Sequence, residues 1–188
     1  MTLNRIRLYT MRLCAVLYFI IFYRIRKEVP APAFFAGAAL VVLGELVRLL
    51  SNSVIRKNTS LAVAGPYAAV RHPLYLGTSL ICLGFLCFHI TGKIYSGVAV
   101  FWIIATAATV LIYRKKIADE EKLMAQLFPR YPEYKKTTPA LFPNLFQIKN
   151  SGLKIIFNPK QIVKNREHKL LTGLVVMLIV IAGGIFYY

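Results

Sequence analysis

The apolar residues of this chain are gathered into five runs, which are separated by short segments rich in Lys, Arg and Pro. The runs cover residues 8–23, 31–50, 74–91, 94–113 and 170–188. A helix needs roughly 20 apolar residues to cross the hydrocarbon of a bilayer, and all but the first run are close to that length. The pattern predicts an all-α fold, a polytopic integral membrane bundle of about five spans, with residues 1–188 as a single domain.

Two of these runs have a further consequence for the topology. Only Gly92 and Lys93 separate the third run from the fourth, which predicts a tight antiparallel hairpin. No small-residue cleavage site follows the first run, so we interpret it as a retained span and not as a removed signal peptide.

The distribution of Lys and Arg sets the expected orientation, because cytoplasmic loops hold the excess of positive charge. Residues 114–169, between the fourth and fifth runs, are the most basic part of the chain and are predicted to be cytoplasmic. The loop at 51–73 then falls on the same face and the hairpin tip on the other. Arg24, Arg26 and Lys27 lie on the outer side in this scheme, against the rule.

The composition supports a membrane protein and narrows its partners. The 188 residues are 57% hydrophobic with a formal charge of +17, and the mean hydropathy is +0.58. Juxtamembrane cations are attracted to anionic headgroups, and no nucleic-acid motif is present, so we expect no nucleic-acid partner. The three cysteines, Cys14, Cys82 and Cys87, lie inside apolar runs without ligand spacing, so no metal site is predicted.

The first candidate motif is the Arg-His-Pro-Leu-Tyr-Leu-Gly stretch at residues 71–77, at the start of the third run. Pro73 suits the first turn of a helix, which places His72 near the cap. The backbone N–H groups of Leu74 and Tyr75 are then expected to be free, and they form a seat for a ligand carboxylate or phosphate.

Gly77, at the end of that stretch, allows another backbone or a flat ligand to approach closely. The alternative for the whole stretch is an interfacial belt, in which Arg, His and Tyr anchor a span at headgroup depth.

An acidic helix is the second candidate. Residues 114–128 contain no Gly or Pro, so the fourth span is predicted to continue out of the membrane as a helix. Glu121 falls in the apolar stripe formed with Ile117 and Met124. A carboxylate on a buried face needs a partner, and we expect either a basic side chain such as Arg71 or a ligand amine.

Glu120, the neighbouring carboxylate, points about 100 degrees round the same helix. It could pair with Lys116 one turn earlier, as an ordinary solvated ion pair.

The remaining segments yield four smaller predictions. The prolines of residues 128–143 exclude a regular helix or central strand, and this loop either closes a pocket with its tyrosines or rests them in the interface. Residues 141–157 are expected along the membrane surface. Asn165 is a suitable N-cap for the last span. Glu45 and Arg48, one turn apart, are expected to pair inside the bundle.

The order and spacing of these motifs resemble the isoprenylcysteine carboxyl methyltransferase family and the related phospholipid methyltransferases. The resemblance rests on four stretches: Gly65-Pro66-Tyr67, residues 70–77, residues 116–121 and residues 128–134. The Arg-His-Pro-x-Tyr-x-Gly element is specific when a Glu-Glu helix follows it, and each is weak alone. Asn165-Arg166-Glu167 looks like a bacterial subgroup of this family. Pro129 stands where the family has Gly, and Lys116 where it has Arg.

The resemblance implies a small helical membrane enzyme that uses S-adenosylmethionine, with the cofactor enclosed by residues 65–143. The cofactor-binding residues implied are His72, Pro73, Leu74, Tyr75, Gly77, Glu120, Glu121, Tyr131 and Tyr134. Arg71, Lys116 and Glu121 are the candidate catalytic residues. A carboxylate acceptor needs a cation such as Arg71 or Lys116 to hold it, whereas an amine acceptor needs a base.

Two hypotheses follow from the sequence. The first is S-adenosylmethionine-dependent methyl transfer to a lipid or lipid-linked carboxylate or amine, at the cytoplasmic face of a bacterial membrane. The alternative is a non-catalytic basic membrane protein that binds anionic lipid or a partner. A membrane reductase that uses a nicotinamide cofactor is a third interpretation, and the Glu-Glu helix argues against it.

Overall fold

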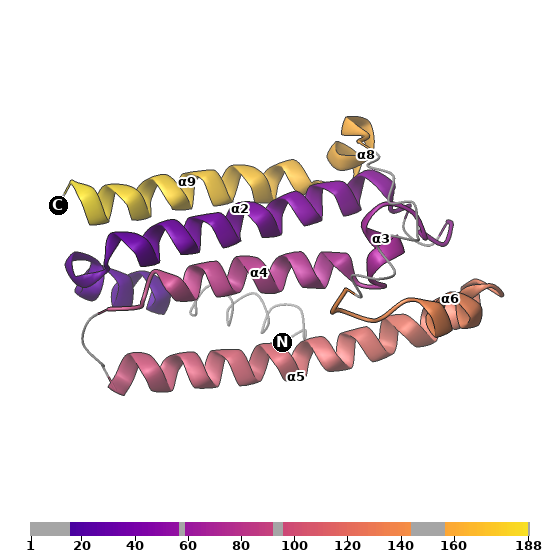
Figure 1. The fold of residues 1–188 in the computed structure, drawn as a ribbon, viewed down its shortest axis with the longest axis horizontal. Helices are drawn as coiled ribbons and strands as arrows, with labels where there is room; N and C mark the ends of the chain where they lie inside the picture. The colour runs from indigo at the N-terminus through magenta and orange to yellow at the C-terminus, as the bar shows by residue number, and fades with distance from the viewer. Residues whose placement is uncertain (1–15, 57–58, 92–95, 144–156, 188) are drawn as a thin grey trace, which may run out of the picture.

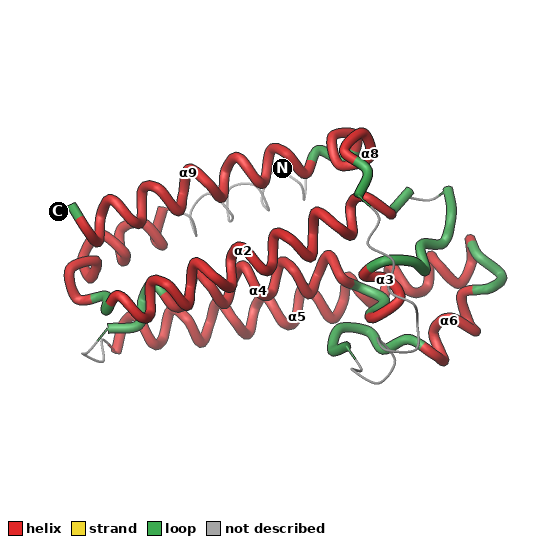
Figure 2. Tube along the Cα trace, turned by 45° about the horizontal axis from the view of Figure 1, so that its top comes forward, coloured by secondary structure: helices red, strands yellow, loops and turns green. Residues whose placement is uncertain are grey.

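The computed structural model describes residues 16–56, 59–91, 96–143 and 157–187, and every regular element in these ranges is a helix. Residues 16–25 are helical. The others are η1 (Arg26–Glu28), α2 (Ala31–Val54), α3 (Pro66–Ala69), α4 (Pro73–Cys87), α5 (Ser96–Leu127), α6 (Tyr131–Thr137), α8 (Pro159–Lys164) and α9 (Glu167–Phe186). Figures 1 and 2 show α2, α4, α5 and α9 aligned as the long members of a bundle. The all-α prediction is confirmed over the described ranges.

Two helices in these ranges, α2 and α9, are long and apolar enough to cross a membrane. They correspond to the second and fifth predicted spans. α5 contains the apolar residues 96–113 and continues unbroken to Leu127, so the predicted helical extension is confirmed. The hairpin at Gly92 and Lys93 lies outside the described residues, as do residues 8–15 of the first predicted span.

α4 is shorter than the predicted third span. It ends at Cys87 after 15 residues, which is about 22 Å of helix and less than the hydrocarbon thickness. The chain turns at Phe88, which is fully buried and whose ring lies 5.6 Å from that of Phe34 and 5.8 Å from that of Phe85. With α4 ending here, the described residues do not contain five complete spans.

Glycines bring α2 and α4 into direct backbone contact. A Cβ added to Gly44 would lie 2.5 Å from the carbonyl oxygen of Gly77, and one added to Gly84 would lie 2.5 Å from that of Gly37. Small residues that let helix backbones approach are typical of helix packing in membranes. Gly77 therefore serves the contact between α2 and α4.

The core and the outer surface are both apolar. Buried Tyr18, Phe22, Phe34, Val41, Ile81, Phe88, Leu174 and Ile181 form one cluster. On the outer faces of the long helices, Phe35 in α2, Ile103 in α5 and Ile179 in α9 are 62–68% exposed. Exposed apolar surface on three long helices suits contact with lipid.

The α8–α9 elbow caps the end of α2. Asn165 ends α8 and is not the N-cap of α9, because Arg166 takes that place with a φ of 62°. The Asn165 amide donates to the carbonyl oxygens of Asn52 and Ile55 at 3.0 and 3.3 Å, and the Gln161 amide donates to Ile55 O at 3.1 Å. These bonds satisfy carbonyls that the end of α2 leaves open.

The prediction that prolines exclude a helix between residues 128 and 143 is wrong, because α6 forms at Tyr131–Thr137. Pro132 lies in its first turn, where the N–H that proline lacks has no helical partner. Pro129 precedes the helix and Pro139 follows it, so the prolines flank α6. Of the segment expected along the membrane surface, residues 144–156 lie outside the described ranges.

Candidate functional site

A cavity of about 510 Å³ lies at the end of the bundle where α2 ends and α4 begins, which we call the site end. Side chains from α2, α3, α4, α5 and α6 line it, together with residues 60–62. In Figure 1 these elements meet on the right, beyond the aligned part of the bundle. The cavity therefore lies where the long helices give way to α3, α6 and the connecting segments.

Most of the residues singled out from the sequence line this cavity. They are His72, Leu74, Tyr75, Glu120, Tyr131 and Tyr134 among the cofactor candidates, and Arg71 and Lys116 among the catalytic candidates. Pro73, Gly77 and Glu121 are not part of the lining. Pro73 and Gly77 are buried in helix packing, and Glu121 lies behind the wall among basic side chains.

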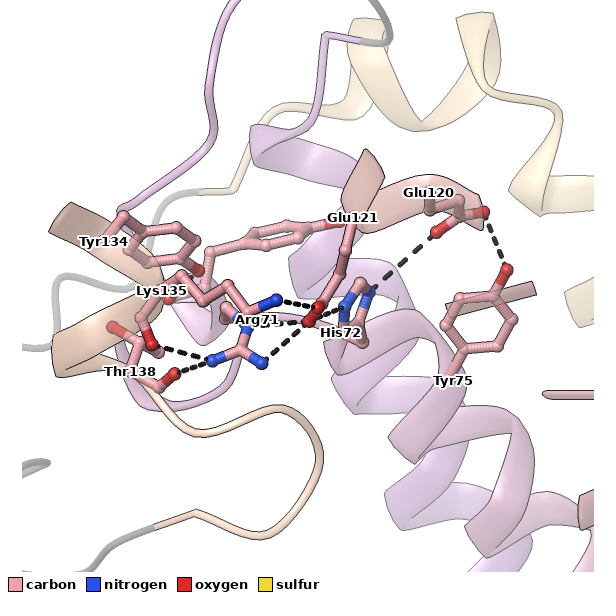
Figure 3. Close-up of polar contacts among 9 residues, drawn as sticks. Arg71, His72, Tyr75, Glu120, Glu121, Tyr134, Lys135 and Thr138 are labelled. Carbon is pink, nitrogen blue, oxygen red and sulfur yellow. Dashed lines mark hydrogen bonds and ion pairs between the residues drawn. The ribbon is translucent and has the colours of Figure 1, made fainter. Parts of the chain in front are cut away.

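Arg71 joins three segments at the edge of the cavity (Figure 3). Its Nε and Nη2 donate to Oε1 of Glu121 at 3.0 and 2.7 Å. Its Nη1 donates to the carbonyl oxygens of Lys135 and Thr138, at 2.9 and 2.5 Å. The expected pairing of Glu121 with Arg71 is confirmed, and the guanidinium fastens the end of α6 to α4 and α5.

Three basic side chains contact the partly buried carboxylate of Glu121. Besides Arg71, it is contacted by His72 Nε2 at 3.3 Å and by Lys135 Nζ at 2.7 Å. Burial alone would raise the pKa of Glu121, but hydrogen bonds from Lys135, Arg71 and His72 lower it to about 2. The side chain is therefore an anion at neutral pH that organises the wall behind the cavity.

Tyr75 and Glu120 join the two motifs on the cavity side of that wall. The Tyr75 hydroxyl donates to Oε1 of Glu120 at 2.7 Å, and His72 Nδ1 lies 3.9 Å from Oε2 (Figure 3). Burial lowers the pKa of His72, although Glu121 and Glu120 act in the opposite direction. The alternative ion pair between Glu120 and Lys116 is not formed within the described ranges.

Backbone contacts take up one of the two N–H groups of the predicted anion seat at the start of α4. The N–H of Tyr75, expected to be free, donates to His72 O at 3.1 Å. The N–H groups of Arg71 and His72 donate to Pro139 O and Ala140 O at 2.8 and 3.0 Å. The expectation of a free Tyr75 N–H is wrong, because the first turn of α4 already supplies its acceptor.

Tyr67 was part of the resemblance but was not singled out as a site residue. Tyr67 lines the cavity, and its hydroxyl is buried and has no hydrogen-bond partner in the described part of the chain. Its backbone oxygen accepts from the Tyr134 hydroxyl at 2.6 Å. A buried hydroxyl without a partner is costly, which makes Tyr67 a candidate contact for a ligand.

Arg48 is a second cavity residue that the sequence did not indicate as part of the site. Its Nε donates to Glu167 at 2.6 Å, and its Nη1 donates to the Thr78 hydroxyl at 2.5 Å and to Leu74 O at 3.4 Å. The predicted contact with Glu45 exists but is longer, at 3.9 Å. Arg48 thus ties α9 to α2 and α4 beside the cavity.

The fold and the site define a helical protein with lipid-compatible outer faces and a polar cavity at one end. The model of the Isoprenylcysteine carboxyl methyltransferase (ICMT) family matches residues 35–126. The matched part of the chain, which contains the start of α4 together with Glu120 and Glu121, is similar to this family. The resemblance stated from the sequence is confirmed.

Two curated relatives are similar to this chain. One is the cobalt-zinc-cadmium resistance protein CzcN of Cupriavidus metallidurans, with 38% identity over 58% of this chain and 47% of the relative. The other is the nickel-cobalt-cadmium resistance protein NccN of Alcaligenes xylosoxydans xylosoxydans, with 30% identity over 64% of this chain and 53% of the relative. The chain thus spans about half the length of these relatives. No solved structure matches it.

Proposed function

We propose that this protein is an S-adenosylmethionine-dependent methyltransferase that acts at the cytoplasmic membrane face on a lipid or lipid-linked carboxylate or amine. One observation carries the proposal. The Tyr75 hydroxyl bonds to Glu120 at 2.7 Å, so the two family motifs meet at a single cavity.

The cavity residues suit the chemical groups of this cofactor. A volume of about 510 Å³ is within the roughly 300–1,000 Å³ of small-molecule sites. Glu120 could hold an ammonium or ribose hydroxyls, and Lys116 or Arg56 could hold a carboxylate. The unpartnered Tyr67 hydroxyl offers one more hydrogen bond, and aromatic faces favour a sulfonium.

The bound cofactor would supply an activated methyl group. The protein then has to hold an acceptor in line with that group and keep water away. The α6 segment is suited to exclude water, because Tyr134 fastens it to Tyr67 O and Arg71 fastens it to Glu121. Catalysis would rest on this positioning.

The structure changes which cation we propose for the acceptor. Arg71 was a candidate, but its guanidinium already bonds to Glu121, Lys135 O and Thr138 O. Lys116 and Arg56 also line the cavity, and neither forms an ion pair within the described ranges. We therefore propose Lys116 or Arg56 to hold a carboxylate acceptor, and Arg71 with Glu121 to position the wall.

For an amine acceptor, the group that takes the proton would be His72 or Glu120. Both line the cavity, and the lowered pKa of His72 keeps its ring neutral and able to accept.

The proposed orientation follows from charge. Exposed cations at the site end include Arg56, Arg114, Lys115, Lys122 and Lys136, and cytoplasmic segments carry the excess of Lys and Arg.

Titration with S-adenosylhomocysteine in detergent tests the proposal. We expect saturable binding, weakened about tenfold by Tyr75→Phe or Tyr67→Phe, because each removes one hydrogen bond to Glu120 or to the ligand. Tyr187→Phe is the matched control, since Tyr187 is 86% exposed at the other end of the bundle and should bind as the parent does. A folded protein that does not bind S-adenosylhomocysteine would overturn the proposal.

A second measurement separates catalysis from binding. The protein is incubated with methyl-labelled cofactor and bacterial lipid extract, and the label is followed into the organic phase.

The alternative function is a non-catalytic basic membrane protein that binds anionic lipid or a partner. It is favoured by the many exposed cations at the site end. Binding of lipid without binding of cofactor would support it. The names of the relatives connect those proteins with metal resistance and do not state a reaction. The two experiments above therefore test the chemistry proposed for this chain.

A further inference from the structure

We propose that α8 and the residues on either side of it form a docking surface for anionic phospholipid headgroups. We call residues 157–169 the α8 surface. The inference concerns a face outside the cavity and does not depend on the proposed methyl transfer.

The orientation of α8 separates an inner from an outer face. Ile162 is 7% exposed and faces the bundle. Lys160, Val163 and Lys164 are three and four residues apart, so they share the opposite face of the helix. Gln161 and Asn165 fix this orientation through their bonds to Ile55 O. The lysines of α8 are therefore held outward.

The charge of the α8 surface is uncompensated. Lys160, Lys164, Arg166 and Lys169 are all exposed, and none forms an ion pair in the described part of the chain. Glu167 is the single acidic residue between 157 and 169. It is 5% exposed and is taken up by Arg48 at 2.6 Å. The surface thus presents four cations and no accessible carboxylate.

Apolar side chains stand out from the same surface. Phe157 is 64% exposed and Val163 is 57% exposed. Exposed apolar groups beside lysines are typical of elements that lie in the membrane interface. In such elements the rings and methyl groups lie among the acyl chains, and the ammonium groups lie at the depth of the phosphates.

The position of α8 matches that depth. α9, which is long and apolar enough to cross a membrane, starts at Glu167, three residues after α8 ends at Lys164. Figure 1 shows α8 at the end of α9, on the same side as the end of α2. An element at the entry of a spanning helix lies at the headgroups. Charge and position together favour anionic phospholipid over a soluble acidic partner.

The experiment uses the full chain in vesicles, with one fluorescent reporter on α8. Trp102 is the single tryptophan, so Trp102→Phe with Val163→Trp places the reporter on the outer face. Brominated phosphatidylglycerol and brominated phosphatidylcholine, at equal mole fraction, serve as quenchers. We expect stronger quenching by the anionic lipid, with a preference of roughly fivefold per contacting lysine that falls with salt.

Lys160→Gln with Lys164→Gln should remove the preference and leave quenching by phosphatidylcholine intact. The matched control is Lys115→Gln with Lys122→Gln, on α5, which should keep the preference for the anionic lipid. Equal quenching by both lipids would overturn the inference. So would a result in which neither lipid quenches the reporter and the protein captures soluble polyglutamate. If Trp102→Phe does not fold, native mass spectrometry of the parent and the lysine variant, counting bound phosphatidylglycerol, decides in the same way.

Discussion

Arg71 and Glu121, fifty positions apart in the chain, are held together by two hydrogen bonds to one carboxylate oxygen, at 3.0 and 2.7 Å. The pair is largely buried, with side chains 11% and 13% exposed. Because Arg71 also bonds to Lys135 O and Thr138 O, one guanidinium fixes α4, α5 and the α6 segment relative to each other. The cavity wall depends on this contact.

Arg71→Met should therefore lower the free energy of unfolding by about 3 kcal/mol, since it leaves Glu121 buried with a weaker set of partners. Arg71→Lys should cost about half as much, because an ammonium keeps the charge but cannot reach both Glu121 and the carbonyls. Thermal unfolding in one detergent measures both. Arg130→Met is the control, as Arg130 is exposed at the neighbouring elbow, and a shift equal to that of Arg71→Met would contradict the role given to the pair.

The pH dependence of stability gives a second prediction. The pKa of Glu121 is lowered from its ordinary 4.5 to about 2, so folding favours the anion. The resulting stabilisation, roughly 3 kcal/mol, is complete above pH 4.5 and is lost as pH falls toward 2. Glu121→Gln should then differ most from the parent at neutral pH and converge with it in acid. A difference in melting temperature that stays constant from pH 7 to pH 3 would show that the carboxylate is not stabilised by its neighbours.

The sequence was sufficient for the parts of the site that local pattern determines. The place of Glu121 in an apolar helical stripe required a partner, and Arg71 provides it. The absence of Gly and Pro from 114–128 gave the extension of α5. Both predictions needed one helix and one rule, with no knowledge of how helices pack.

Packing between elements decided the predictions that were wrong. Gly77 was expected to admit another backbone or a flat ligand and was included among the cofactor residues, and it is the backbone of α2 that lies beside it. Asn165 was assigned to cap its own helix, yet it caps α2, 113 positions away. The partners of Arg48 on α4 and α9 lie 30 and 119 positions away. Contacts between residues so far apart in the sequence depend on which helices pack side by side. The periodicity of apolar residues does not show this.

The glycine contact between α2 and α4 gives the third prediction. Gly44→Ala places a methyl group 2.5 Å from a backbone oxygen of α4 and 2.9 Å from Ile81, so the helices must separate. Overpacking of this kind costs about 1–3 kcal/mol. Gly173→Ala in α9 is a matched control, because nothing lies within 4 Å of the added methyl, and it should be neutral or slightly stabilising in a helix.

Melting temperatures of the two alanine variants in the same detergent provide the comparison. Since Gly77 O, the atom nearest the new methyl, is next to Thr78 at the cavity, Gly44→Ala should also weaken ligand binding. Equal stability of the two variants would show that the close approach of α2 and α4 is not maintained.

The last prediction concerns Glu45 and Glu167, which contact the same arginine, Arg48, at different distances. Glu167 accepts from Arg48 Nε at 2.6 Å, whereas Glu45 lies 3.9 Å away and its carboxylate oxygens have no hydrogen-bond partner in the described part of the chain. Both carboxylates are buried. Removing the close partner leaves Arg48 poorly compensated, whereas removing the distant one relieves a buried charge that is poorly solvated.

Glu167→Gln should therefore destabilise the protein by about 2–4 kcal/mol, and α9 should loosen from α2. Glu45→Gln should change stability by less than about 1 kcal/mol, or stabilise, although Glu45 is as deeply buried. Thermal unfolding ranks the two variants, and limited proteolysis near residue 165 reports on the α9 contact. The opposite ranking would mean that Glu45 carries the ion pair and that the contact between Arg48 and Glu167 contributes little.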